Sequence, residues 1–450
     1  MADHHACKVP ECAGSQNLPQ VGWLGGGCCA AYEYQVGLPS HDRLSASTIV
    51  PTRLSPNSCM NQRLVEVAQV FLRLGALSFG GPAAHTALMQ KEVVEERQWL
   101  RAAEFLDLMG AVNLIPGPNS TEMAILLGLR RAGWAGLGVA GVCFILPAAL
   151  ITTLIAWGYR EWGTLPQVAP LLVGIQPVTV VLILDAGWRL GQKAVKSRGL
   201  LLVGAGVVVL SVLGVGEVWA LLAGGLLGIF LQRRPPQLTQ RAGWPWLGFP
   251  VGMAAMPGAE MPAPHLGLLA LFFLKVGAVL FGGGYLLVAF IENDLVNRYG
   301  WLTQQQLLDA IAVGQFTPGP VLSTASFIGF QIAGWAGAVV STVAIFLPSF
   351  VFVALLHPIL LWCRRTAWTG AFLDGLNVGA VALIGVVAVR LGWQIGVVPL
   401  ATAVGQGVWV LGIGLLSGVL LVWRRVPAPW LIGLGAVLGV LGYGLGMIAA

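Results

Sequence analysis

Two kinds of helix-breaking motif, each present twice, are the parts of this chain best suited to chemistry. Proline flanks glycine on both sides at residues 116–118 and again at 318–320, while glycine-rich triplets interrupt apolar segments at 80–82 and 282–284. A proline removes a backbone donor and clashes with the preceding turn, so each motif ends one helix and starts another. The free N–H groups at a new helix start carry partial positive charge and attract anions. The motifs therefore predict an anion-binding site, although glycine also serves close helix packing and proline also kinks helices.

Two cations, Arg73 and Lys275, lie about two turns before the glycine breaks, on the same apolar segments. A charge deep in a bilayer is costly unless it is paired or hydrated, so its presence in both segments indicates attraction of an anion. The alternatives are that the two side chains reach a membrane interface, or that they pair with Asp107 and Asp309.

Polar residues surround the proline motifs. Asn113 and Gln315 precede them, and hydroxyl residues follow them at 120–121 and 323–324. Uncharged donors near a helix start suit an oxyanion, but serine and threonine also join helices in membranes. Glu122 has no acidic counterpart in the second motif, and it is either a carboxylate for proton coupling or a bystander near a loop. The full predicted set of substrate-binding residues is Arg73, Gly80, Gly81, Asn113, Pro116, Gly117, Pro118, Lys275, Gly282, Gly283, Gln315, Pro318, Gly319 and Pro320.

These motifs belong to a duplicated unit. Residues 71–82 and 273–284 are identical at seven of twelve positions, at a shift of 202 residues. Trp99-Leu100 recurs as Trp301-Leu302, and the Gly-Trp-Ala-Gly stretch that follows the first proline motif recurs after the second. Rare residue types in the same order indicate two homologous halves, because a shared apolar bias would not align them.

The elements that position the motifs are membrane helices. Hydrophobic residues make up 56% of the 450 and charged residues 10%, with a mean hydropathy of +0.79, so a water-soluble fold is excluded. Several apolar runs exceed the ~18–20 residues that cross a bilayer, and strand alternation is absent. The fold class is therefore an all-α polytopic membrane protein with roughly 11–13 membrane helices, broken at the glycine and proline motifs. The net charge of +6 reflects basic loops that face the cytoplasm, and no nucleic-acid-binding arm is present.

The chain divides by composition into four parts. Residues 1–59 are rich in Gly, Ser and Pro and are predicted to be a disordered extension that the repeat does not need. The first repeat covers 60–231 and the second 266–450, joined by a linker at 232–265. The linker contains an apolar piece, Trp244 to Met256, that could supply one extra crossing.

The basic loops indicate that the two halves have opposite orientations in the membrane. In the first half the cytoplasmic side is marked by the loops after the second and fourth apolar segments, and in the second half by the loops after the first, third and fifth. Segment 91–101, whose basic residues are balanced by glutamates, falls on the opposite side in the first half. Arg189 and Arg390 end equivalent segments and are interpreted as interface anchors. The marker residues are Arg130, Arg131, Lys193, Lys196, Arg198, Arg298, Arg364, Arg365, Arg424 and Arg425. This pattern predicts an inverted-topology repeat, as in many secondary transporters.

Taken in order over roughly residues 64–450, the motifs resemble the chromate transporter (CHR) family in its long, two-domain form. The resemblance rests on Phe79-Gly80-Gly81-Pro82, on its copy Phe281-Gly282-Gly283-Gly284, and on the paired proline and Gly-Trp-Ala-Gly motifs. It implies export of chromate across the inner (plasma) membrane, which confers chromate resistance. It also implies that sulfate, a dianion of similar shape, is a competitor or counter-substrate.

Two other functions stay open at this point. One is the export of a different small anion, and the other is a membrane-embedded enzyme or scaffold. No catalytic motif, metal site or cofactor motif occurs in the apolar segments, which argues against an enzyme. The absence of large soluble domains argues against a scaffold. The partners predicted are therefore chromate and sulfate as substrates and the lipid bilayer, and whether the protein forms a homo-oligomer is left open.

Overall fold

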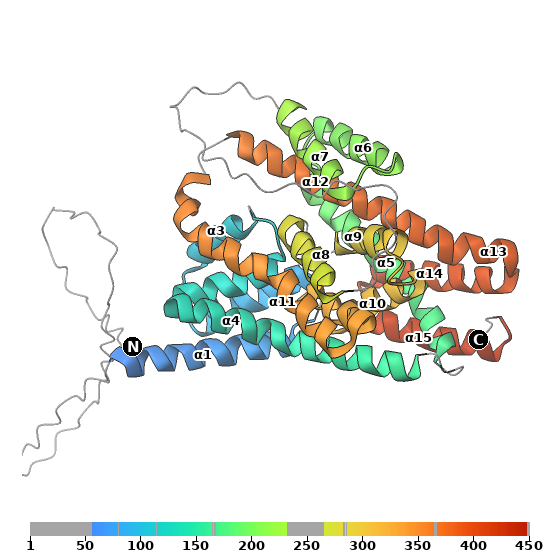
Figure 1. Cartoon of the computed structure of the whole chain (residues 1–450), viewed down its shortest axis with the longest axis horizontal. Coiled ribbons are helices and arrows are strands. Elements are labelled where there is room, and N and C mark those ends of the chain that lie inside the picture. Colours follow the sequence, from blue (N-terminus) through green and yellow to red (C-terminus); the bar gives the residue numbers. More distant parts are fainter. Residues whose placement is uncertain are drawn as a thin grey trace, which may run out of the picture. The chain divides into compact units, whose positions relative to one another are not determined.

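The computed structural model describes residues 56–79, 81–113, 115–163, 165, 168–231, 265–281, 284, 286–363 and 367–447. Over these residues the chain is helical and contains no strand (Figure 1). The contacts divide the chain after Gln62, and the part from Arg63 onward is the subject below. Most of the predicted extension, the predicted linker with Trp244–Met256, and Gly80, Gly282 and Gly283 lie outside the described residues.

Nine apolar helices in the described ranges account for the bulk of the membrane-embedded part. Five stretches are long and apolar enough to cross a bilayer. They are Asn119–Trp162 (α4), Ala169–Ala194 (α5), Val321–Leu355 in η3 (Val321–Ser323) and α11 (Thr324–Cys363), Gly370–Leu400 in α12 (Ala367–Gly392) and beyond, and Val404–Arg424 (α14). Four shorter apolar helices join them: α6 (Arg198–Val212), α7 (Glu217–Leu231), α8 (Leu266–Val279) and α15 (Ala428–Gly444). The prediction of an all-α polytopic membrane protein is confirmed.

Helices break where the sequence predicts that they break. In the first half, α1 (Pro56–Leu77) ends and α2 (Gly81–Gln90) begins at the glycine motif, and α3 (Ala102–Val112) ends before the proline motif from which α4 (Asn119–Trp162) starts. The second half repeats this arrangement with α8, α9 (Leu287–Phe290), α10 (Gln304–Phe316) and α11 (Thr324–Cys363). Gly117 and Gly319 have φ values of 140° and 88°, which β-carbon-bearing residues rarely adopt.

The long helices α4 and α11 each contain one sharp bend of the same geometry. Ala132 and Gly133 have φ/ψ values of −137°/25° and 64°/−152°, and Ala333 and Gly334 have −138°/23° and 62°/−150°. In each helix the two arms then pack tightly, since a β-carbon added to Gly128 would lie 2.3 Å from the backbone oxygen of Gly136. Each helix is therefore a hairpin of a short and a long arm, and the repeat extends to backbone detail.

The long arms of α4 and α11 run antiparallel. A β-carbon on Gly141 would touch Phe350, and further along α4 the Gln331 amide donates to the Ala156 oxygen at 2.8 Å. The bend of α11 at Gly334 therefore lies beside the far end of α4, 23 residues beyond the bend of α4 at Gly133. At ~1.5 Å per residue that separation is about 35 Å, comparable to the thickness of a bilayer core. The two bends thus face opposite sides, which is the predicted inverted topology.

One expectation about the loops is wrong. Segment 91–101 was expected on the opposite side from Arg131, but the Arg131 guanidinium and the Trp99 indole both donate to the Glu66 carboxylate, at 2.6 and 3.0 Å. Further into the hairpin, Arg73 of α1 pairs with Glu92. The chain therefore enters the membrane-embedded part through α1, turns at the glycine break and returns through α2 to the side from which it came. Half-helices of 10–13 residues are too short to cross a bilayer.

Candidate anion-binding site

The helix breaks of the two halves are bonded to each other reciprocally. The Gly117 N–H of the first proline motif donates to the Leu280 oxygen at 2.7 Å, and the Gly319 N–H of the second donates to the Ser78 oxygen at 2.9 Å. Leu280 and Ser78 are equivalent positions, each preceding the Phe-Gly-Gly of its own half. We call the Gly117–Leu280 contact the first joint and the Gly319–Ser78 contact the second joint. In this conformation both glycine N–H groups bind the other half of the protein and do not face a ligand.

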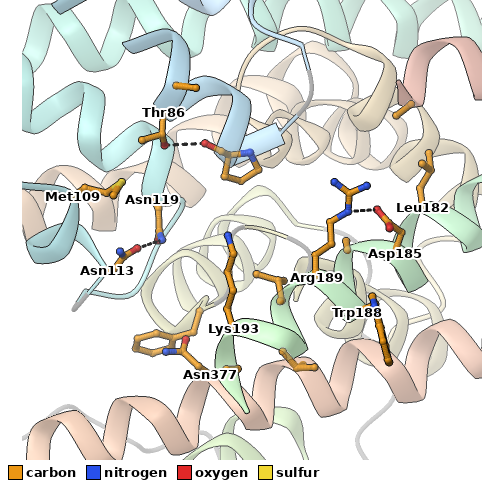
Figure 2. Close-up of a pocket in the computed structure, with 18 of the residues that line it drawn as sticks. Thr86, Met109, Asn113, Asn119, Leu182, Asp185, Trp188, Arg189, Lys193 and Asn377 are labelled. Carbon is orange, nitrogen blue, oxygen red and sulfur yellow. Dashed lines mark hydrogen bonds and ion pairs between the residues drawn. The ribbon is translucent and has the colours of Figure 1, made fainter. Parts of the chain in front are cut away.

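A cavity of about 1110 Å³ lies beside the breaks and is shared by the two halves (Figure 2). Break residues of both halves line it, together with side chains from α5, from the start of α12 (Ala367–Gly392) and from the end of α14 (Val404–Arg424). The lining residues within or beside the predicted motifs include Pro82, Asn113, Ile115, Asn119, Phe281 and Gln315. The structure therefore brings the breaks of both halves to one cavity.

Several break residues with polar side chains line this cavity. The Asn119 amide donates to the Asn113 side-chain oxygen at 2.6 Å, and both side chains are seen at the wall in Figure 2. The Gln315 side-chain nitrogen is buried and has no hydrogen-bond partner within the described part of the chain. A buried donor without an acceptor is costly, so a turn of the Gln315 side chain toward a ligand that accepts a hydrogen bond would relieve that cost. Of the predicted site residues, Asn113 and Gln315 thus line the cavity.

The cavity carries an excess of positive charge. Four cations line it, against two acids. Arg189 pairs with Asp185 at 2.7 Å and Lys196 with Asp374 at 2.8 Å. The other two cations, Lys193 and Arg425, form no ion pair with any described residue. Figure 2 shows Arg189 and Lys193 extending from α5 toward the interior of the cavity. Two uncompensated positive charges beside hydrogen-bond donors match a small dianion.

Sequence reasoning missed these cations as binding residues. Arg189 was interpreted as an interface anchor, and Lys193 and Arg425 served only to mark the cytoplasmic side. A signal was available for two of them, because Arg189 and Lys193 are four residues apart and so share one helix face. Nothing local in the sequence connects them with Arg425 from the other half.

Arg73 and Lys275 do not line the cavity. Arg73 lies 3.9 Å from a carboxylate oxygen of Glu92, and Lys275 forms a hydrogen-bonded ion pair with Asp294. These acids are equivalent positions of the two repeats, and they differ from the partners considered from the sequence, Asp107 and Asp309. The Asp309 carboxylate instead accepts a hydrogen bond from the Tyr159 hydroxyl at 2.9 Å. A binding role for Arg73 and Lys275 remains a prediction.

Comparison with known proteins agrees with this architecture. The family described as "Chromate transporter" matches the chain twice, over residues 65–229 and 267–440. The "Probable chromate transport protein" of Synechococcus elongatus is 32% identical, covering 84% of this chain and 95% of the relative. The "Chromate transport protein" of Cupriavidus metallidurans is 31% identical, over 85% and 94%. That of Pseudomonas aeruginosa is 32% identical, over 77% and 85%.

No solved structure matches this chain. The two matched stretches contain both sets of helix breaks and both bent helices, and the relatives span nearly the same length as the chain. The chain therefore belongs to the chromate transporter family, which is a family of membrane transporters and not of enzymes.

Proposed function

We propose that this protein exports chromate across the plasma (inner) membrane and thereby confers chromate resistance, with the cavity at the helix breaks as its binding site. The observation that carries the proposal is the pair of unpaired cations, Lys193 and Arg425, in a cavity lined by break residues of both halves. The printed names of three relatives, each a chromate transport protein, support the choice of substrate.

The chemistry of the cavity suits a tetrahedral dianion. Chromate that leaves water must have its two charges met by cations and its oxygens met by donors. Lys193 and Arg425 supply the charge, and the Gln315 side-chain nitrogen supplies a buried donor that has no acceptor within the described residues. The N–H groups of Gly117 and Gly319 would add further donors if the two joints open during transport.

The charge of the substrate and of the cavity supports the proposed outward direction of transport. Lys193, Lys196 and Arg425 mark the cytoplasmic side by the positive-inside rule, so the cavity described here is the face that loads from the cytoplasm. An inside-negative potential contributes ~2.3 kcal/mol per charge per 100 mV, hence about 4.6 kcal/mol for a dianion that leaves the cell. That corresponds to a concentration ratio on the order of a thousandfold, so export needs no nucleotide.

Sulfate has the same shape and charge as chromate, and we propose it as a competitor or counter-substrate. Uptake of radiolabelled chromate into everted membrane vesicles tests both parts of the proposal. We expect uptake above that of vesicles without the protein, inhibition by external sulfate, and stimulation by sulfate preloaded inside if the two anions exchange. Uptake equal to that of control vesicles would refute the proposed substrate, and a different small anion would then be sought by competition.

A further inference from the structure

We propose that the second half contains a release site for the dianion, which is closed in this structure and opens to the outside when the cavity closes. The proposal rests on the proposed function, in which the cavity loads from the cytoplasm, and it adds the place from which the anion leaves. The release site is a small space beside α9, α10 and η3, which we call the closed chamber. Its lining residues are Gly284, Leu287, Val288, Ile291, Ile311, Gln315, Val321 and Thr324.

The closed chamber is the repeat equivalent of the cavity. Five of its eight lining residues lie 202 positions after residues that line the cavity, which is the shift between the two glycine motifs. These five come from the glycine break, the half-helix that follows it, the end of the next half-helix and the start of the bent segment. The pairs are Pro82 and Gly284, Thr86 and Val288, Met109 and Ile311, Asn113 and Gln315, and Asn119 and Val321.

The two equivalent spaces are in opposite states. The cavity has a volume of about 1110 Å³, whereas the closed chamber has about 10 Å³, which is room for about one water and not for a tetrahedral oxyanion. The half-helices that border them differ in the same sense. Leu88 of α2 is 38% exposed, but its equivalent Phe290 is 0% exposed, and each residue from Leu286 to Ile291 is buried. One half therefore faces an open space where the other is packed shut.

The inverted topology assigns each space to one side of the membrane. The bends at Gly133 and Gly334 lie at opposite ends of the α4–α11 pair, so equivalent points of the two halves face opposite sides. The cavity lies on the cytoplasmic side, which Lys193 and Arg425 mark, and the closed chamber then leads to the outside. If the halves exchanged conformations, as inverted repeats allow, the cavity would close and the chamber would open outward.

One polar residue belongs to both spaces. Gln315 at the end of α10 lines the cavity and also lines the closed chamber. Its side-chain nitrogen is buried and has no hydrogen-bond partner among the described residues, so it is free to donate to an anion in either place. A dianion that moves from the cavity to the chamber would therefore keep one contact throughout. We assign Gln315 as the residue at which the anion passes from the loading side to the release side.

The closed chamber offers a dianion fewer partners than the cavity does. Four cations line the cavity, whereas none of the described residues that line the chamber is charged. Where the cavity has Thr86 and Asn119, the chamber has Val288 and Val321. The Thr324 hydroxyl of the chamber already donates to the Val321 oxygen at 2.7 Å. A dianion should therefore bind weakly on the outer side, which favours its release there.

Cysteine labelling tests whether the chamber opens outward. Single cysteines replace Thr86 or Val288 in a cysteine-free background, and an impermeant thiol reagent is added to one side of the membrane. Val288→Cys should react only from the outside, although Val288 is buried in this structure, and Thr86→Cys should react only from the cytoplasm. Leu269→Cys is the matched control, because Leu269 of α8 is buried in the same half but does not line the chamber. It should stay unreactive from both sides.

The affinity for sulfate at the two faces provides a second test that needs no variant. Inhibition of chromate transport by sulfate is measured at zero potential in everted and in right-side-out vesicles. The half-inhibiting concentration should be at least about 10-fold higher at the outer face, because the cations remain with the cavity. Val321→Asn restores the side chain that the first half has at this position, and it should lower the outer value about 2- to 10-fold.

Three results would overturn the proposal. One is labelling of Val288→Cys from the cytoplasm, or from neither side in a membrane where Thr86→Cys reacts. Another is equal reaction of Leu269→Cys, which would show general loosening of the second half. The third is equal half-inhibiting concentrations of sulfate at the two faces. Absence of any chromate transport would instead refute the proposed function, and the labelling, which needs no substrate, would still test the chamber.

Discussion

Replacing Lys193 with glutamine tests whether the cavity binds the substrate by charge. Lys193 is one of two cavity cations without an ion-pair partner among the described residues, so the change removes half of the positive excess. At about 4 Å in a water-like dielectric a lysine and a dianion attract by roughly 2 kcal/mol, which salt and side-chain motion reduce to about 1–2 kcal/mol. The half-saturation concentration for chromate should therefore rise about 5- to 30-fold.

The assay is chromate uptake by everted vesicles at equal protein abundance, measured at two salt concentrations. The effect should shrink at high salt, because the side chain is exposed. Lys193→Arg should keep the wild-type affinity, and Arg425→Gln should weaken binding by a similar factor. Lys91→Gln is the matched control, since it removes an exposed lysine that does not line the cavity. A wild-type half-saturation value in Lys193→Gln, or an equal loss in Lys91→Gln, would refute the assignment of the site.

Three further predictions concern the architecture. Single cysteines placed at Arg130 and Trp335 in a cysteine-free background should react with an impermeant reagent from opposite sides of the membrane, because the two bends lie at opposite ends of the α4–α11 pair. Labelling of both cysteines from the same side would contradict the inverted repeat. Gly117→Ala should lower the melting temperature, because an added β-carbon would lie 2.1 Å from the Glu122 carboxyl group, and adding Glu122→Ala to this variant should partly restore it. Gly110→Ala is the control, since a β-carbon there meets nothing within 4 Å. A chain that starts at Met60 should keep chromate resistance, although α1 begins at Pro56, and loss of resistance at equal abundance would show that the first 59 residues are needed.

Much of this fold could be predicted from the sequence because its signals are local. A proline or glycine break acts on its own helix, and the recurrence of the same motif 202 residues later indicates the repeat without any knowledge of contacts. The reversal of basic loops between halves likewise indicates opposite orientations. The error over segment 91–101 arose because hydropathy shows that a segment is apolar and does not show whether it crosses or turns back.

The site was harder to predict because it depends on which distant residues meet. The joints connect the proline motif of one half to the glycine motif of the other, and no local pattern encodes that exchange. Arg73 and Lys275 attracted attention because both repeats keep them, yet both pair with acids outside the cavity. The cations that do line the cavity, Lys193 and Arg425, come from different halves and are not equivalent positions of the repeat. Repetition therefore identified the scaffold better than it identified the charges that bind.

Chromate flux from proteoliposomes under an imposed potential is the most direct test of dianion transport through this protein. Purified protein is reconstituted with chromate inside, and a potassium gradient with an ionophore sets the potential. An inside-negative potential should accelerate chromate efflux, an inside-positive one should slow it, and protein-free liposomes should show neither effect. Efflux equal to that of protein-free liposomes, or efflux that does not respond to the sign of the potential, would contradict the account.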